Sequence, residues 1–110
     1  MAEEKPAFKI SILASGSSGN SLYIESEKKR LLVDAGLSGK KITSLMAQID
    51  RTPDQLDGIL VTHEHRDHIH GVGVLARKYH LDVFANQQTW EAMEPLSGKV
   101  PVEQKHPFAM

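Results

Sequence analysis

The apolar residues of this chain follow the spacing of a β-strand in some stretches and the spacing of an α-helix in others. The alternation of these stretches limits the fold more than any other feature. Runs rich in β-branched and aromatic residues are separated by stretches whose apolar residues recur at helical spacing. A length of 110 residues allows at most one domain. Strands that alternate with helices predict an α/β architecture whose sites lie at strand ends. The expected strands are residues 8–14, 21–25, 30–36, 58–63 and 81–85.

Between residues 8 and 25 the strand pattern predicts a hairpin, and from 30 to 36 a strand covered on both faces. Helical spacing then predicts three helices, and the last twelve residues could begin one more strand. Side chains that cap or break helices set the expected boundaries. Ser38 caps the first helix, whose apolar spacing extends to Ile49. The second begins near Asp67 or His68 and its apolar spacing extends to Tyr79. Asn86 caps the third, which Pro95 and Gly98 end.

The composition excludes several classes of protein. No cysteine is present, which excludes a disulfide framework and thiolate metal ligands and fits a reducing compartment. A net charge of −1 gives no overall attraction to nucleic acid or to an anionic membrane. The amino terminus is acidic, and no apolar run reaches the roughly 18 residues that span a bilayer. We therefore expect a cytoplasmic protein with no membrane partner.

Four of the six histidines lie within "HEHRDHIH", residues 63–70. At an extended strand end, side chains two apart point the same way, so His63, His65 and Asp67 can converge while His68 follows at the turn. Imidazole and carboxylate donors suit zinc, manganese or iron, and the lack of sulfur favours an open catalytic site over a closed structural one. Imidazoles this close repel one another when protonated unless a cation holds them neutral. The cluster therefore predicts a metal site.

Other interpretations apply to single residues of this region. Asp67 could simply cap the helix that follows. Glu64 and Arg66 alternate with the ligand candidates and should point away from them, as packing or supporting groups. The remaining histidines fall outside the ligand spacing and are expected to be solvated: His70, His80 and His106.

Three stretches resemble the metallo-β-lactamase fold hydrolases: "THEHRDHIHG", "ILASGSSGNSLYIE" and "LLVDAGLSGKKI". Within that family they are similar to the WalJ/YycJ branch, whose members are regarded as nuclease-like bacterial hydrolases. The resemblance runs from about Phe8 to the last residue. It implies an αββα sandwich of two similar halves, of which residues 1–110 would be the amino-terminal half. The remainder of the domain, with further metal ligands, would be absent, because His106 comes too early to supply the third histidine of the first metal.

The resemblance also implies roles for individual residues. His63 and His65 would bind the first of two divalent ions, and Asp67 and His68 the second, with zinc as the expected metal and manganese or iron as alternatives. Asp67 is also the candidate catalytic residue. Asp34 would orient a ligand from behind, although it could instead cap the turn after its strand. Ser17 and Asn20 are candidate substrate contacts because their loop resembles the signature of the branch, and a plain hairpin turn is the alternative. Apart from the resemblance, the free N–H groups and partial positive charge of a helix N-terminus make Lys40 a third candidate, with a solvated first helical turn as the alternative.

The function implied by the resemblance is metal-dependent hydrolysis of phosphodiesters in nucleic acid, with water activated by two metals and an exonuclease on single-stranded DNA as the specific form. Two alternatives stay open. The same centre could hydrolyse a thioester, lactam or lactone, or the chain could be a non-catalytic metal-binding fragment. Because the ligands of the second half would be missing, we expect the chain alone to be inactive. Half a sandwich also leaves one sheet uncovered, so we expect the chain to be marginally stable or self-associated.

Overall fold

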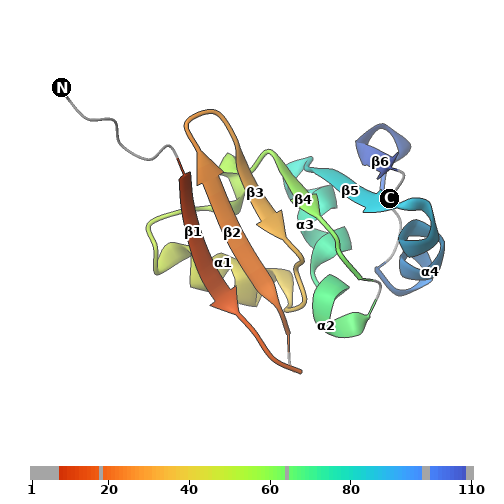
Figure 1. Ribbon diagram of the computed structural model, residues 1–110, viewed down its shortest axis with the longest axis horizontal. Coiled ribbons are helices and arrows are strands. Elements are labelled where there is room, and N and C mark those ends of the chain that lie inside the picture. The colour runs from red at the N-terminus through yellow and green to blue at the C-terminus, as the bar shows by residue number, and fades with distance from the viewer. Residues whose placement is uncertain (1–7, 18, 64, 98–99, 109–110) are drawn as a thin grey trace.

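The computed structural model describes residues 8–17, 19–63, 65–97 and 100–108. Within this part of the chain, six strands form one sheet in chain order (Figure 1). The first three strands are antiparallel, which confirms the predicted hairpin, and the third to the sixth are parallel. The strands are β1 (Phe8–Ala14), β2 (Ser21–Ser26), β3 (Arg30–Val33), β4 (Gly58–Leu60), β5 (Asp82–Asn86) and β6 (Lys105–Phe108).

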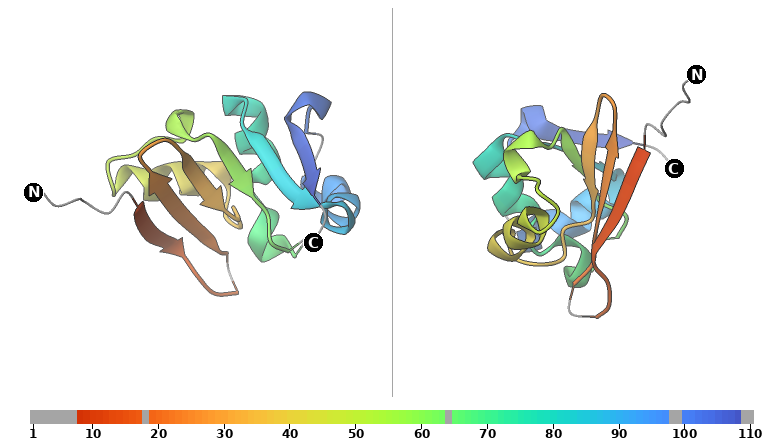
Figure 2. Two further views of the ribbon diagram at one scale, coloured as in Figure 1. Left: turned by 45° about the horizontal axis from the view of Figure 1, so that its top comes forward. Right: turned by 90° about the vertical axis from the view of Figure 1, so that its left-hand side faces the viewer.

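Helices occupy each of the three parallel crossovers and gather on one side of the sheet (Figure 2). The predicted caps are present: the Ser38 hydroxyl accepts from the Lys41 N–H at 3.2 Å, and the Asn86 side chain accepts from the Thr89 N–H at 2.8 Å. The helices are α1 (Gly39–Ala47), η1 (Pro53–Gln55), α2 (Arg66–Ile69), α3 (Val72–Tyr79), α4 (Gln87–Ser97) and η2 (Val102–Gln104). None of the described helices is long and apolar enough to cross a membrane.

The two faces of the sheet differ in burial. Tyr23, Leu32, Ile59 and Val83 are cross-strand neighbours, and each is at most 1% exposed. They pack with the helices into the hydrophobic core. Side chains alternate across a strand, so the intervening residues point to the opposite face. That row is only half-buried: Leu22, Val33, Leu60 and Phe84.

We call this second surface of the sheet the open face, defined by Leu22, Val33, Leu60 and Phe84. It corrects the expectation that the third strand is covered on both sides. Leu31 and Val33 are only half-buried because the helices cover one face, and Leu32 alone of the three is fully buried. On β1 at the edge of the sheet, Ile12 is 72% exposed.

The helix expected from about Asp67 to Tyr79 is broken in two, which is a second correction. The break lies at Gly71, whose N–H donates to the Ala35 carbonyl at 2.7 Å instead of continuing the helix. A Cβ at this position would lie 2.3 Å from the Leu37 carbonyl oxygen, so only glycine allows the approach. The loop after β3 therefore separates α2 from α3.

Two predictions near the carboxyl end concern the end of the last long helix and a strand in the tail. The helix that Pro95 and Gly98 were expected to end is α4, which includes Pro95 and ends at Ser97, one position before Gly98; a proline in the last turn removes only one backbone donor. The additional strand suggested for the tail is present as β6, which pairs in parallel with β5.

Candidate metal centre

Asp34 follows β3 and holds an unusual backbone conformation. Its φ is +66°, in the left-handed region, and the residue is 5% exposed. Its N–H donates to the Leu60 carbonyl at 2.7 Å, and its own carbonyl accepts from the Ser21 hydroxyl at 2.9 Å. Contacts on both sides thus hold the strained residue between β2 and β4.

The Asp34 carboxylate connects the loop after β3 with the loop after β4. One oxygen, Oδ1, accepts from the Thr62 N–H at 2.7 Å. The other, Oδ2, accepts from the Thr62 hydroxyl at 2.7 Å and lies 2.7 Å from Nδ1 of His68. Asp34 therefore contacts a predicted metal ligand directly. That it supports the ligand in metal binding stays a prediction.

Three of the predicted ligands bring their imidazole rings together. His63 and His65 lie in the loop after β4, and His68 lies in α2. Strand β4 was expected to reach His63 but ends at Leu60. The ring of His63 is centred 5.9 Å from that of His65 and 5.0 Å from that of His68. Two imidazoles on one tetrahedral zinc would have centroids roughly 5 Å apart. The spacing of the rings therefore fits a site for one ion or two adjacent ions.

The complete predicted ligand set cannot be traced in the described residues. The backbone of Asp67 lies in α2, but its side chain and that of Arg66 lie outside the described part, as does all of Glu64. Among the described residues, no group of three or more histidine, aspartate or glutamate side chains is arranged to hold an ion. The assignment of His63, His65, Asp67 and His68 as ligands stays a prediction.

The position of His68 is fixed through its backbone as well as its ring. The His68 carbonyl accepts from the Ala35 N–H at 2.9 Å, and the His68 N–H donates to the His65 carbonyl at 2.8 Å. Together with the bond from Gly71 to Ala35, these contacts press α2 against the residues that follow Asp34. The loop after β3 therefore sets both ends of the Asp34–His68 contact.

The candidate substrate contacts lie in different surroundings. Asn20 closes the hairpin turn with its side chain, which donates to the Gly16 carbonyl at 2.9 Å and accepts from the Gly16 N–H at 3.1 Å. It also borders a hollow of about 260 Å³ that Asp34 and His68 line. Ser17 is exposed in the turn. Lys40 is exposed near the start of α1 and borders another hollow, of about 390 Å³, between α1 and α3.

Two of the other histidines behave as predicted and one does not. His70 and His80 are exposed. His106 is only partly exposed: it lies in β6, its ring stacks on Phe84 at 4.8 Å between centroids, and its Nε2 lies 3.1 Å from an Asp82 oxygen. The expectation of a solvated residue was wrong because parallel pairing of β6 with β5 places His106 beside Phe84.

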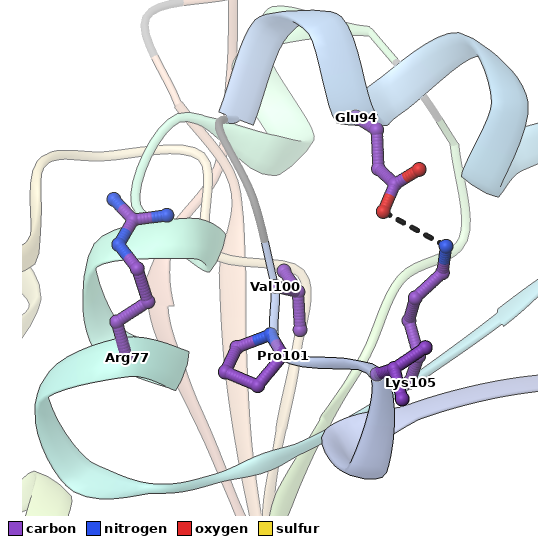
Figure 3. A pocket seen from close by; sticks show the side chains of 6 residues that line it. Arg77, Glu94, Val100, Pro101 and Lys105 are labelled. Carbon is purple, nitrogen blue, oxygen red and sulfur yellow. Dashed lines mark ion pairs between the residues drawn. The ribbon is translucent and has the colours of Figure 1, made fainter.

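A larger hollow, of about 460 Å³, lies between α3, α4 and the segment before β6 (Figure 3). Glu94 and Lys105 form an ion pair at 2.8 Å within it. None of its lining residues is a candidate ligand, so the chemistry of the histidine cluster does not extend here. The lining residues are Arg77, Glu94, Val100, Pro101, Val102 and Lys105.

Residues 14–107 match the Metallo-beta-lactamase superfamily. The chain belongs to this superfamily. Solved structures agree on the fold: a B3 metallo-beta-lactamase with an active site glutamic acid aligns at a TM-score of 0.72 and 23% identity, over 91% of this chain and 42% of that one. The metallo-beta-lactamase fold protein YhfI from Bacillus subtilis aligns at 0.65 and 19%, over 96% and 46%.

Two curated relatives with similar sequences are named as exodeoxyribonucleases. The superfamily member described here is 70% identical over 105 residues to Exodeoxyribonuclease WalJ of Streptococcus pneumoniae serotype 2 (strain D39 / NCTC 7466). It is 57% identical over 101 residues to Exodeoxyribonuclease YycJ of Bacillus anthracis. These matches cover 94% and 92% of this chain but 39% and 38% of the relatives. The chain thus spans about two fifths of their length.

Proposed function

We propose that this chain carries the amino-terminal part of the metal centre of an exodeoxyribonuclease-like hydrolase. One observation carries the proposal. In a chain 70% identical to a protein named exodeoxyribonuclease, the rings of His63, His65 and His68 lie together, and a buried carboxylate holds the last of them. Clusters of this chemistry serve divalent ions rather than structural packing.

The ligand set retains the sequence-based assignment. His63 and His65 hold the first ion, and Asp67 and His68 hold the second, with zinc as the metal and manganese or iron as alternatives. Such ions supply the Lewis acidity that activates a water and neutralises charge on a phosphate. Asp34 accepts a hydrogen bond from His68 and keeps the ring oriented. Asp67, the candidate catalytic residue, lies one position before His68 in α2.

Residues 1–110 form the amino-terminal half of a longer αββα domain in this proposal. Two facts support it: the chain spans about two fifths of its curated relatives, and none of the helices in the described part of the chain lies over the apolar open face. The second half would cover the open face and supply the missing ligands. Alone, the chain is then inactive, and its exposed apolar surface favours self-association.

The substrate class follows from the named relatives. We assign DNA as the substrate, with single strands preferred, and this is consistent with the predicted cytoplasmic location. Asn20 is the best placed of the candidate contacts, because it borders the hollow that Asp34 and His68 line. Ser17, on the same turn, and Lys40, on α1, are the other candidates.

The test uses the complete protein, purified without chelators and assayed for bound metal. End-labelled single-stranded and double-stranded DNA are compared with a lactam, a lactone and a thioester. We expect DNA degradation that a chelator abolishes and that added Zn²⁺ or Mn²⁺ restores. His68→Ala should lower the rate by about 100-fold or more, since ligand-sphere changes cost at least 10- to 100-fold, whereas the matched change His70→Ala should leave it intact.

Two results would contradict the proposal. Turnover of an acyl substrate with intact DNA would move the activity to the other hydrolase class. A complete protein that contains no metal and does not respond to added metal would remove the catalytic centre altogether and leave a non-catalytic module.

A further inference from the structure

The Thr62 hydroxyl lies between two groups of the candidate metal centre. Its oxygen is 2.7 Å from Oδ2 of Asp34 and 3.1 Å from Nδ1 of His63. The Thr62 N–H is itself held by Oδ1 of Asp34 at 2.7 Å, so the residue is fixed at two points. Thr62 thus connects an imidazole at the surface with a carboxylate that is buried.

The direction of these hydrogen bonds follows from the number of available protons. A hydroxyl has one proton to donate, and a carboxylate can only accept. The Thr62 hydroxyl therefore donates to Asp34. Its oxygen can then contact Nδ1 of His63 favourably only as an acceptor, which requires the proton of the neutral ring to be on Nδ1.

The same carboxylate oxygen determines the state of His68. Nδ1 of His68 lies 2.7 Å from Oδ2 of Asp34, and a carboxylate next to this nitrogen requires Nδ1 to be the donor. In both neutral rings the lone pair is then on Nε2. A ligating histidine depends on such a partner at its other nitrogen, because the partner fixes the tautomer and the ring orientation.

We propose that Thr62 is a positioning residue whose hydroxyl donates to Asp34 and accepts from Nδ1 of His63. Through this pair of hydrogen bonds, which we call the relay, one buried carboxylate fixes the Nδ1–H tautomer of both His63 and His68. The relay would leave the Nε2 lone pair of each ring available to a metal ion. Its value for metal binding rests on the proposed function. The tautomers themselves are properties of the metal-free protein and can be measured without that assumption.

The experiment records long-range ¹H–¹⁵N correlations of the histidine rings in the complete, metal-free protein. The pH is chosen so that the ring ¹⁵N shifts themselves show His63 and His68 to be neutral. Loss of a signal in His63→Gln assigns His63. We expect the wild-type protein and Thr62→Ser, which keeps the hydroxyl, to show His63 protonated at Nδ1. Thr62→Val, which removes only the hydroxyl, should move His63 to the mixed pattern of the exposed His70.

The same spectra also provide the controls. His68 should stay protonated at Nδ1 in every Thr62 variant. Thr43→Val removes a hydroxyl that donates to the Gly39 carbonyl at 2.8 Å within α1, and it should leave the His63 signal unchanged. A wild-type His63 protonated at Nε2 would overturn the relay whether or not Thr62→Val folds. A His63 signal that does not respond in a folded Thr62→Val protein would overturn it as well.

Zinc affinity gives a second measurement. Chelator competition should show weaker binding by about 10- to 100-fold in Thr62→Val, the usual cost of removing a group that supports a ligand, with recovery in Thr62→Ser. Failure of the relay and failure of the proposed function are distinguishable. DNA cleavage with an Nε2-protonated His63 contradicts the relay alone, and the predicted tautomers without DNA cleavage contradict the nuclease assignment alone.

Discussion

Oδ2 of Asp34 lies 2.7 Å from Nδ1 of His68, although 34 residues separate the two along the chain. The contact joins the loop after β3 to α2. Further hydrogen bonds fix the backbone of both residues: Leu60 and Ser21 bind that of Asp34, and Ala35 binds that of His68. A side chain held in this way is preorganised before any ion is bound, which is how groups behind a ligand raise metal affinity.

Replacing Asp34 by Asn should weaken metal binding without unfolding the chain. Asparagine tolerates the left-handed backbone at φ +66°, but its amide has one accepting oxygen where the carboxylate has two. Either the Thr62 N–H or the pair formed by His68 and the Thr62 hydroxyl then loses its acceptor. We expect metal affinity to fall by about 10- to 100-fold in a chelator competition assay. Asp50→Asn is the matched control, because Asp50 is exposed and has a φ of +59°. Equal losses in both variants would show that the backbone, not the carboxylate contact, matters.

Gly71→Ala should destabilise the fold. The new Cβ would meet the Leu37 carbonyl oxygen at 2.3 Å, and backbone cannot yield as a flexible side chain can. We expect the free energy of unfolding to fall by about 1–3 kcal/mol, the range for overpacked sites, in urea denaturation. Val74, in the helix α3 that follows Gly71, is 49% exposed in the wild type, and Val74→Ala should change stability by about 0.5 kcal/mol or less. Gly71→Ala with wild-type stability would mean that the loop after β3 shifts freely.

Local patterns were sufficient to predict most of the elements. The period of the apolar residues located the hairpin, and the side chains of Ser38 and Asn86 located two helix starts, because a cap depends on residues three positions away. The approach of His63, His65 and His68 was also predictable, since all three lie within six residues. In each case the decisive interaction is short in sequence.

The features that were missed depend on contacts between distant residues. The break at Gly71 involves the bond from its N–H to the distant Ala35 carbonyl, and the partial burial of His106 arises from the pairing of β6 with β5. The Thr62 hydroxyl bond to Asp34 spans 28 residues. No periodicity or capping signal encodes such pairs, so Thr62 stood in the sequence only as the residue before the histidine cluster.

Glu25 should make stability depend on pH in the acid range. The Arg51 guanidinium donates to both carboxylate oxygens, at 2.7 and 3.3 Å, and lowers the pKa of Glu25 from 4.5 to about 2, with the Tyr23 hydroxyl assisting. Because the pKa is lower in the folded state, this stabilisation is complete above about 4.5 and is lost as the pH falls toward about 2.

The measurement is the difference in melting temperature between the wild type and Glu25→Gln across this pH range. We expect a constant advantage for the wild type near neutral pH that shrinks between about 4.5 and about 2. Glu27→Gln changes an exposed neighbour in the adjoining turn and should show no such dependence. An advantage that persists undiminished at the acid end would mean that the Arg51 contact does not set the Glu25 pKa.

The open face should make the 110-residue chain associate in solution. Leu60 lies near the centre of that face, between Val33 and Phe84. Burial of a leucine side chain contributes about 1.5–3 kcal/mol, so Leu60→Lys should raise the dissociation constant by about tenfold or more in sedimentation velocity runs at several concentrations. Val102→Lys, at a position 79% exposed in η2, should not alter association.

In the complete protein, where the proposed second half covers the open face, Leu60→Lys should lower the melting temperature instead. A 110-residue chain that stays folded and monomeric at every concentration would contradict the expected self-association, and a complete protein indifferent to Leu60→Lys would contradict the covered face.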